Sequence, residues 1–120
     1  MGRGPVNTIV MTSQMLEIDR YVLSSLMVDL VGHDRTPGAY LVYLALWRLA
    51  GGVARRSVAL SLRSLSAETG LSKSAVQRAV GHLRRRGLIG TTQDNPTAAP
   101  RYRLHTPWRR NASAEADEAC

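Results

Sequence analysis

The first helical pattern of the chain runs from Gln14 to Val31. Apolar residues recur there at helical spacing and form a stripe along one side, namely Met15, Ile18, Val22, Leu26 and Leu30. This stripe is widened by Leu16, Leu23 and Met27. Two carboxylates, Asp19 and Asp29, interrupt the stripe, and a break near Tyr21 stays open as an alternative. The pattern predicts an N-terminal helix with one broad apolar side.

A second helix is predicted from Pro37 to Ala50. Gly32 ends the first pattern, and Thr36 followed by Pro37 has the form of an N-cap with proline at the first helical position. The helix is apolar nearly all round, which predicts burial on several sides; its large apolar residues are Tyr40, Leu41, Val42, Tyr43, Leu44, Leu46, Trp47 and Leu49. Gly51 and Gly52 end it, and a short strand is predicted over Ser57–Leu62.

The most informative stretch lies between Ser61 and Val80. Ser61 is a predicted N-cap of a short helix, Gly70 can adopt the left-handed conformation that ends it, and Leu71 fills the angle before the next helix. Ser72 is a predicted cap of that second helix. The residues expected to face inward are Leu62, Leu65 and Ser66 in the first helix and Val76, Ala79, Val80 and Leu83 in the second. Two short helices at a steep angle require this spacing of small, glycine and apolar positions.

The outward face of the second helix follows from helical geometry with Val76 at the centre of the buried face. It carries Ser74, Gln77, Arg78, Gly81 and Arg85, and no acid occurs between Gly70 and Gln93. Such side chains bind base edges and phosphates, whereas a merely solvated face normally includes Glu or Asp. A glycine inside a helix costs roughly 1 kcal/mol relative to alanine, so Gly81 either permits a close approach to DNA or to another helix, or is a tolerated weak position.

A two-stranded hairpin is predicted after this helix. Gly87 closes the helix, Leu88–Thr92 and Arg101–Leu104 are strands, and Gln93–Pro100 forms a polar loop. Alternation turns Tyr102 and Leu104 inward. It leaves Arg101 and Arg103 on the outer side.

The charge of the chain is unevenly distributed. The net charge is +7, and fifteen of the sixteen basic residues are Arg. The first 50 residues are neutral overall, residues 51–110 carry twelve basic residues against Glu68 and Asp94, and residues 111–120 carry three acids. Arginine-rich codon usage explains the choice of Arg over Lys but not the scarcity of acids in the same segment. A basic half of this kind is typical of a surface that binds a polyanion.

The order of helix, short strand, two helices and hairpin over residues 37–106 resembles the winged-helix families of bacterial regulators. The run LSKSAVQRAVGHLRRRGLI is similar to the corresponding stretch of the MarR and GntR families and of winged modules in phage and plasmid proteins. The resemblance implies a mainly α (α+β) winged helix-turn-helix fold, with an additional N-terminal helix and a two-stranded wing. It also implies DNA contacts by Arg63, Ser72, Lys73, Ser74 and Gln77, with Arg101 and Arg103 serving the wing. Thr69 departs from the pattern, because that family position is usually more apolar.

Other reactive residues do not form a recognisable site. His33, His82 and His105 lack metal-ligand spacing, and no catalytic triad, carboxylate pair or phosphate-binding glycine loop is visible, so we expect no cofactor, no metal and no enzymatic activity. His82 is either a phosphate contact or an exposed bystander. Trp47 and Trp108 are expected to serve packing. Cys120 has no intramolecular disulfide partner, since it is the single cysteine.

These patterns predict a flexible lead over residues 1–13, one domain over 14–108 and a disordered tail over 109–120. With no signal peptide and no apolar stretch of membrane-spanning length, a cytoplasmic, nucleoid-associated protein is expected. The function indicated is a homodimeric, sequence-specific transcriptional regulator that binds double-stranded DNA, without a small-molecule effector. Two alternatives stay open: an accessory DNA-binding protein for plasmid or phage replication or partition, and a winged helix that binds protein, which the basic half disfavours.

Overall fold

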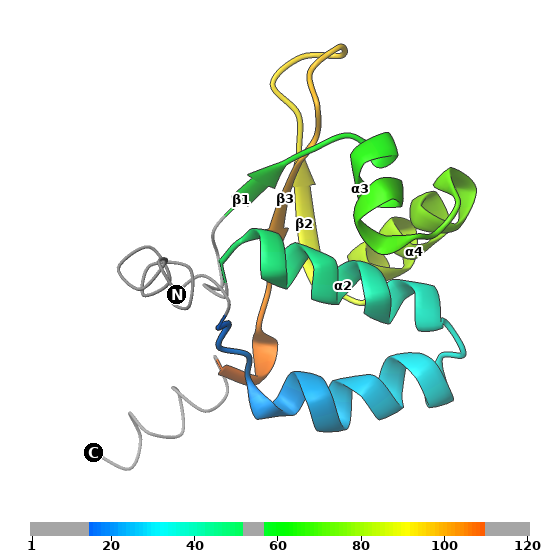
Figure 1. Cartoon of the computed structure of the whole chain (residues 1–120), viewed down its shortest axis with the longest axis vertical. Coiled ribbons are helices and arrows are strands. Elements are labelled where there is room, and N and C mark those ends of the chain that lie inside the picture. The colour runs from blue at the N-terminus through cyan, green and yellow to red at the C-terminus, as the bar shows by residue number, and fades with distance from the viewer. Residues whose placement is uncertain (1–14, 52–56, 110–120) are drawn as a thin grey trace, which may run out of the picture.

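The computed structural model describes residues 15–51 and 57–109. Gly52, the predicted lead, and residues 110–120 of the predicted tail lie outside the described residues. The elements in chain order are the π-helices η1 (Val22–Leu26) and η2 (Val28–His33), the helix α2 (Pro37–Leu49), the strand β1 (Ser57–Ala59), the helices α3 (Leu62–Thr69) and α4 (Lys73–Arg85), and the strands β2 (Ile89–Thr92) and β3 (Arg101–Leu104) (Figure 1). This is the predicted α+β winged-helix arrangement with an additional N-terminal helix.

The N-terminal helix, formed by η1 and η2 together, begins later than predicted. Helical structure starts at residue 20, and residues 15–19 are not helical, so the helix starts late and has no break at Tyr21. Side chains of α2 hold this segment by its backbone: the Trp47 indole N–H donates to the carbonyl of Glu17 at 2.7 Å, and the Tyr40 hydroxyl donates to that of Val22 at 2.8 Å. Every fourth residue of the helix is buried against α2, namely Val22, Leu26 and Leu30.

The two acids that interrupt the N-terminal stripe bind basic residues from the far end of the chain. Asp19 accepts hydrogen bonds from Nε and Nη2 of Arg109 at 2.7 and 2.6 Å, and from the Trp108 indole at 2.9 Å. The Arg109 guanidinium thereby holds the pKa of Asp19 below its ordinary value. Asp29 pairs with Arg86. Both acids therefore anchor the N-terminal helix to the rest of the domain, and Trp108 also stacks on Tyr21 with ring centroids 4.6 Å apart.

The helix α2 lies at the centre of the molecule, between the N-terminal helix and the layer formed by α3, α4 and the sheet (Figure 1). Seven of its thirteen residues are buried, as the pattern predicted. Pro37 occupies the first turn, but the side chain of Thr36 does not cap the helix. Its hydroxyl instead donates to the carbonyl of Leu30 at 3.2 Å, which fixes the connection between the two helices.

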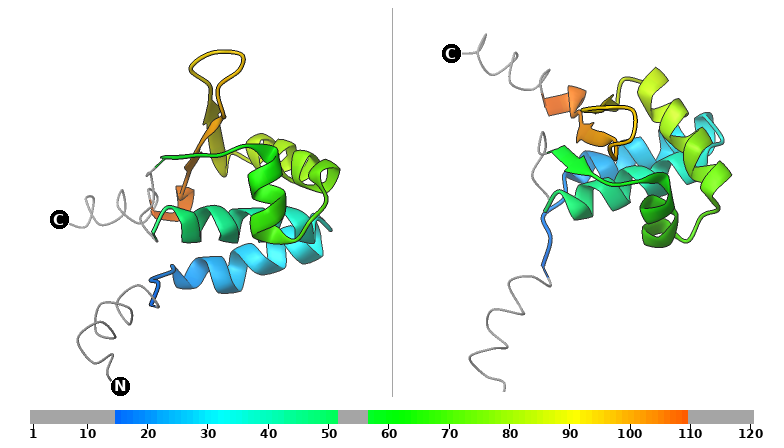
Figure 2. Two further views of the ribbon diagram at one scale, coloured as in Figure 1. Left: turned by 45° about the horizontal axis from the view of Figure 1, so that its top comes forward. Right: turned by 90° about the horizontal axis from the view of Figure 1, so that it is seen from above.

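The strands form an antiparallel sheet in the order β1-β3-β2. In the central strand Tyr102 and Leu104 are buried while Arg101 and Arg103 are exposed, which confirms the predicted alternation. The strand predicted over Ser57–Leu62 is shorter than expected, because Leu62 already begins α3. The hairpin of β2 and β3, called the wing below, projects away from the helices (Figure 2). Within the described residues, every helix is too short or too polar to cross a lipid bilayer.

Candidate nucleic-acid interface

The turn between α3 and α4 has the geometry that the sequence predicts. The Ser61 hydroxyl accepts a hydrogen bond from the backbone N–H of Ser64 at 3.1 Å, and the Ser72 hydroxyl accepts one from that of Ala75 at 3.1 Å. These contacts satisfy backbone donors that the first turn of each helix leaves without a helical partner. Gly70 ends α3 with φ of 81°, a left-handed conformation that suits glycine.

Side-chain hydrogen bonds fix the angle between α3 and α4. The Ser66 hydroxyl donates to the carbonyl of Leu71 at 2.5 Å. The Thr69 hydroxyl donates to the carbonyl of Leu65 at 2.8 Å and accepts from the N–H of Leu71 at 3.2 Å. Thr69, the position that departs from the family pattern, is therefore satisfied by the turn itself. On the inner side Val76 is fully buried, as predicted.

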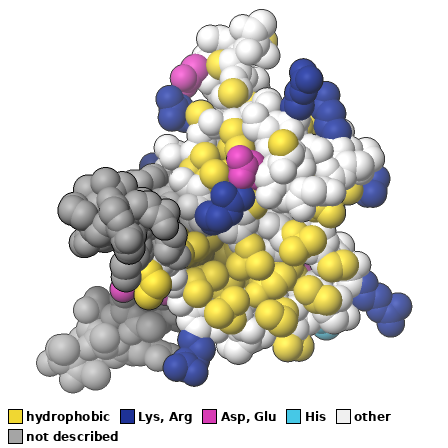
Figure 3. Space-filling model, in the orientation of Figure 1, with side chains coloured by type: hydrophobic (Ala, Val, Ile, Leu, Met, Phe, Trp, Pro, Cys, Tyr) yellow, Lys and Arg dark blue, Asp and Glu magenta, His cyan; other side chains and the backbone are white. Residues whose placement is uncertain are grey.

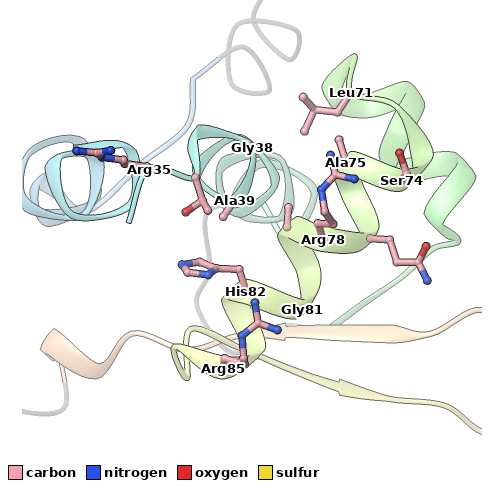
Figure 4. A pocket seen from close by; sticks show the side chains of 13 residues that line it. Arg35, Gly38, Ala39, Leu71, Ser74, Ala75, Arg78, Gly81, His82 and Arg85 are labelled. Atoms are coloured by element: carbon pink, nitrogen blue, oxygen red, sulfur yellow. The ribbon is translucent and has the colours of Figure 1, made fainter. Parts of the chain in front are cut away.

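The opposite side of α4 is open and polar. Lys73, Ser74, Gln77, Arg78 and Arg85 are all exposed, and Ser72 at the start of α4 and Arg63 on α3 are exposed as well. Figure 4 shows Ser74, Arg78 and Arg85 along one groove of about 740 Å³, which α4 forms with the N-terminal end of α2. Of the predicted helical site residues, Ser74, Gln77, Arg78 and Arg85 line this groove, whereas Arg63, Ser72 and Lys73 are exposed but do not line it.

A second groove, of about 480 Å³, separates α4 from the wing. Gln77, Gly81 and Arg84 line its helical side, and Thr92 and Gln93 belong to its wing side. Gln77 and Gly81 line both grooves, so one surface runs from α2 across α4 to the wing. A Cβ at Gly81 would meet only the Arg85 guanidinium, at 3.5 Å, so no helix of the described chain requires a glycine there.

The basic residues divide into paired and unpaired groups. Within residues 15–51 and 57–109, ion pairs join Arg48 to Glu68, Arg86 to Asp29 and Asp34, Arg101 to Asp94, and Arg109 to Asp19. No ion pair in this part of the chain involves Arg35, Arg63, Lys73, Arg78, Arg84, Arg85 or Arg103. The described acids that form ion pairs therefore bind basic residues other than Lys73, Arg78, Arg84 and Arg85, so these four side chains of α4 keep their positive charge.

The wing arginines differ in their surroundings. Arg101 lies 3.9 Å from a carboxylate oxygen of Asp94 in the wing loop, and both side chains are well exposed. A surface pair of this length contributes little and does not hold Arg101 away from another anion. Arg103 is exposed and makes no ion pair within the described residues. Both remain on the outer side of the sheet, as the alternation predicts.

His82 is not the exposed bystander considered from the sequence, because its side chain is largely covered and pairs with Asp34. Its Nε2 donates to Asp34 Oδ2 at 2.7 Å, and Arg86 Nε lies 3.0 Å from the same oxygen. Hydrogen bonds from His33 and His82, followed by the charge of Arg86, lower the pKa of Asp34, although burial opposes the shift. The Asp34 side chain is only 8% exposed. His82 and Arg86 therefore clamp the end of α4 to the end of η2, and we call this contact the Asp34 clamp.

Ligating atoms of Asp29, His33 and Asp34 lie within 4.8 Å of one another, a cluster that the sequence spacing did not reveal. The two carboxylates already bind the cationic side chain of Arg86, and Asp34 also binds His82. We therefore interpret the cluster as an ion-pair network between helices.

Two basic residues of this surface were not singled out from the sequence. Arg84 lines the groove beside the wing, and Arg35 lines the groove between α4 and α2. The run of three arginines at residues 84–86 is a signal for Arg84, although a basic last turn also suits the dipole of any helix. For Arg35 the sequence offers no signal, because its place depends on how the N-terminal helix packs.

Residues 36–89 match the model of a family described as "Helix-turn-helix domain". The match runs from the residue before α2 to the first residue of β2, and it includes α3, the turn at Gly70 and α4. Over this part of its length the chain is therefore similar to helix-turn-helix domains. Comparisons with curated proteins and with solved structures gave no match.

Proposed function

We propose that this helix-turn-helix domain binds double-stranded DNA sequence-specifically and regulates transcription, without a catalytic step or a small-molecule effector. One observation carries the proposal: the exposed side of α4 holds Gln77, Arg78 and Arg85 and no acid, and neither arginine forms an ion pair among the described residues. A recognition helix requires such a face, because it meets both base edges and phosphates.

In the proposed complex α4 lies in the major groove. Gln77, in the middle of the exposed face and shared by both grooves, is positioned to pair with an adenine edge. Arg78 and Arg85 bind guanine or flanking phosphates, and Ser72, Lys73, Ser74 and Arg63 bind the backbone at the start of α4. Arg101 and Arg103 bind phosphates beside the groove through the wing. The nucleoid would be the site of action.

We further propose that the regulator is a homodimer. Leu23, Met27 and Val31 each follow a buried residue of the N-terminal helix by one position, so they form a second row beside the buried one. With Leu41 of α2 they make up what we call the apolar face, and all four are exposed by more than a third. Figure 3 shows a broad apolar area over the N-terminal helix and α2, with basic side chains toward the edges of the molecule.

A second copy of the chain is the occupant that fits this face. The four side chains carry no charge, so a two-fold axis can bring two identical apolar faces together without desolvating ions. Monomeric proteins seldom expose apolar patches larger than about 300–600 Å² unless a partner covers them. The resulting dimer would present two copies of α4 to half-sites about one helical turn apart.

The experiment is a selection of binding sites from random DNA with the wild type, Gln77→Ala and Arg101→Ala. Gln77→Ala should cost about 1–3 kcal/mol on the selected site and relax preference at one base pair. Arg101→Ala should weaken selected and random DNA alike, and make the salt slope shallower by about one unit. Arg48→Ala is the control, since Arg48 is an exposed arginine that pairs with Glu68 away from this surface.

Two results would contradict the proposal. If the wild-type protein enriches no DNA sequence in the selection, it is not a sequence-specific regulator. If Arg101→Ala changes the selected DNA sequence while Gln77→Ala leaves it unchanged, the wing recognises the bases. That result would overturn the role of α4 as the recognition helix. The arrangement of selected half-sites separates the remaining alternative, because a role in replication or partition predicts direct repeats, whereas a two-fold regulator predicts a palindrome.

A further inference from the structure

Arg35 has an unusual backbone conformation at the edge of the α4 surface. Its φ is 55°, and among the described residues it is the one non-glycine with positive φ. A long side chain in this left-handed region is uncommon, and such strain persists only where the surrounding structure determines it. The structure around Arg35 must therefore hold the residue in this conformation.

Both neighbours of Arg35 are anchored. Asp34 is held by the Asp34 clamp, through His82 at 2.7 Å and Arg86 at 3.0 Å. The backbone N–H of Thr36 donates to the carbonyl of Leu30 at 2.8 Å. The backbone between these two points turns sharply, and the side chain of Arg35 extends from the turn into solvent. The same clamp thus fixes Arg35 relative to α4.

Arg35 lines the same groove as Ser74, Arg78 and Arg85. In Figure 4 Arg78 and Arg85 lie on the α4 side, whereas Arg35 comes from the connection before α2 and its guanidinium extends away from α4. Arg35 makes no ion pair within the described part of the chain. The positive surface consequently continues past the recognition helix, in the direction opposite to the wing.

We propose that Arg35 binds a phosphate of the DNA strand that borders the major groove, on the side of α4 away from the wing. A guanidinium offers two parallel N–H donors to a phosphate, and its planar fork gives the contact a fixed orientation. With the wing on one side and Arg35 on the other, the DNA backbone is held on both sides of α4. The proposal rests on the proposed function, and it adds a contact that binds DNA irrespective of sequence.

The test compares Arg35→Asn, Arg35→Lys and Arg20→Ala with the wild type. Asparagine adopts the left-handed conformation more readily than arginine, so Arg35→Asn should keep or raise the melting temperature. The same variant should lower affinity for selected and random DNA by about tenfold, as expected for the loss of one charge-assisted contact. Its salt slope should become shallower by about 0.9. Arg35→Lys should restore most of the slope.

Arg20→Ala is the matched control. Arg20 is an exposed arginine at the other end of the N-terminal helix, with no ion pair among the described residues. If Arg20→Ala weakens binding as much as Arg35→Asn does, total charge explains the effect and the phosphate contact is refuted. Wild-type affinity and salt slope in Arg35→Asn also refute it. If Gln77→Ala still loses affinity in that case, the proposed function stands without the Arg35 contact.

Discussion

Replacing Asp34 by Asn tests whether the Asp34 clamp stabilises the domain. The carboxylate is nearly buried and accepts a hydrogen bond from His82 at 2.7 Å, and Arg86 Nε lies 3.0 Å from the same oxygen in an ion pair. Asparagine keeps the shape but replaces one acceptor oxygen with a donor that faces other donors. A hydrogen bond to a charged group contributes about 1.5–3 kcal/mol, and the partial exposure of Arg86 reduces that value. We therefore expect Asp34→Asn to lower the free energy of unfolding by about 2–3 kcal/mol.

The pH dependence gives the prediction a second, independent readout. Hydrogen bonds from His33 and His82 lower the pKa of Asp34 in the folded state. The stabilisation by this carboxylate is therefore complete above the ordinary pKa of an aspartate, and it is lost as the pH falls through the lowered value. Urea unfolding at several pH values should show a difference between wild type and Asp34→Asn that is full at about pH 5 and shrinks below about pH 4.

Asp94→Asn is the control for the clamp, because Asp94 is exposed and lies 3.9 Å from Arg101 in a surface pair. It should change the free energy of unfolding by less than about 0.5 kcal/mol. An Asp34→Asn protein as stable as the wild type would show that the clamp carries no net stabilisation. A difference that stays constant down to about pH 3 would show that the stabilisation does not come from the charge of Asp34.

Three further predictions concern the core, the dimer and the charge. Val76→Asp should abolish the cooperative thermal transition followed by circular dichroism, since it buries a carboxylate between α3 and α4; an unchanged melting temperature would disprove the helical register. Met27→Glu should yield monomers in sedimentation without lowering the monomer's melting temperature, and a wild type that is monomeric at tens of micromolar would exclude the apolar face as a dimer contact. If six to ten phosphates are contacted, wild-type affinity should fall by about 10³–10⁵ between 50 and 200 mM salt, and affinity independent of salt would oppose DNA binding.

The parts of the fold that could be predicted from the sequence depend on short-range chemistry. Ser61 and Ser72 cap the helices that they precede, and Gly70 takes the left-handed turn, because each acts on backbone groups within a few residues. The exposed side of α4 was likewise predictable, since helical geometry places it once Val76 is assigned to the core. In each case the local preference and the tertiary structure agree.

The parts that could not be predicted depend on contacts between distant segments. His82 and Asp34 are separated by 48 residues, and Asp29 and Arg86 by 57. Nothing in one sequence says which acid meets which base, so the contact of His82 with Asp34 was not predicted. The late start of the N-terminal helix has the same origin, because the Trp47 indole binds the carbonyl of Glu17. Arg35 joins the candidate site only through this packing.

The contact of Asp19 with Trp108 and Arg109 spans 89 and 90 residues, from the beginning of the described chain to its last described positions. During synthesis on a ribosome, the helix-turn-helix segment is made before Arg109 is added. The carboxylate of Asp19, just before the N-terminal helix, therefore stays in water until nearly the whole domain has been translated. Translation order thus separates two events: α2, α3 and α4 are synthesised first, and Asp19 can be paired only after Trp108 and Arg109 have been added to the chain.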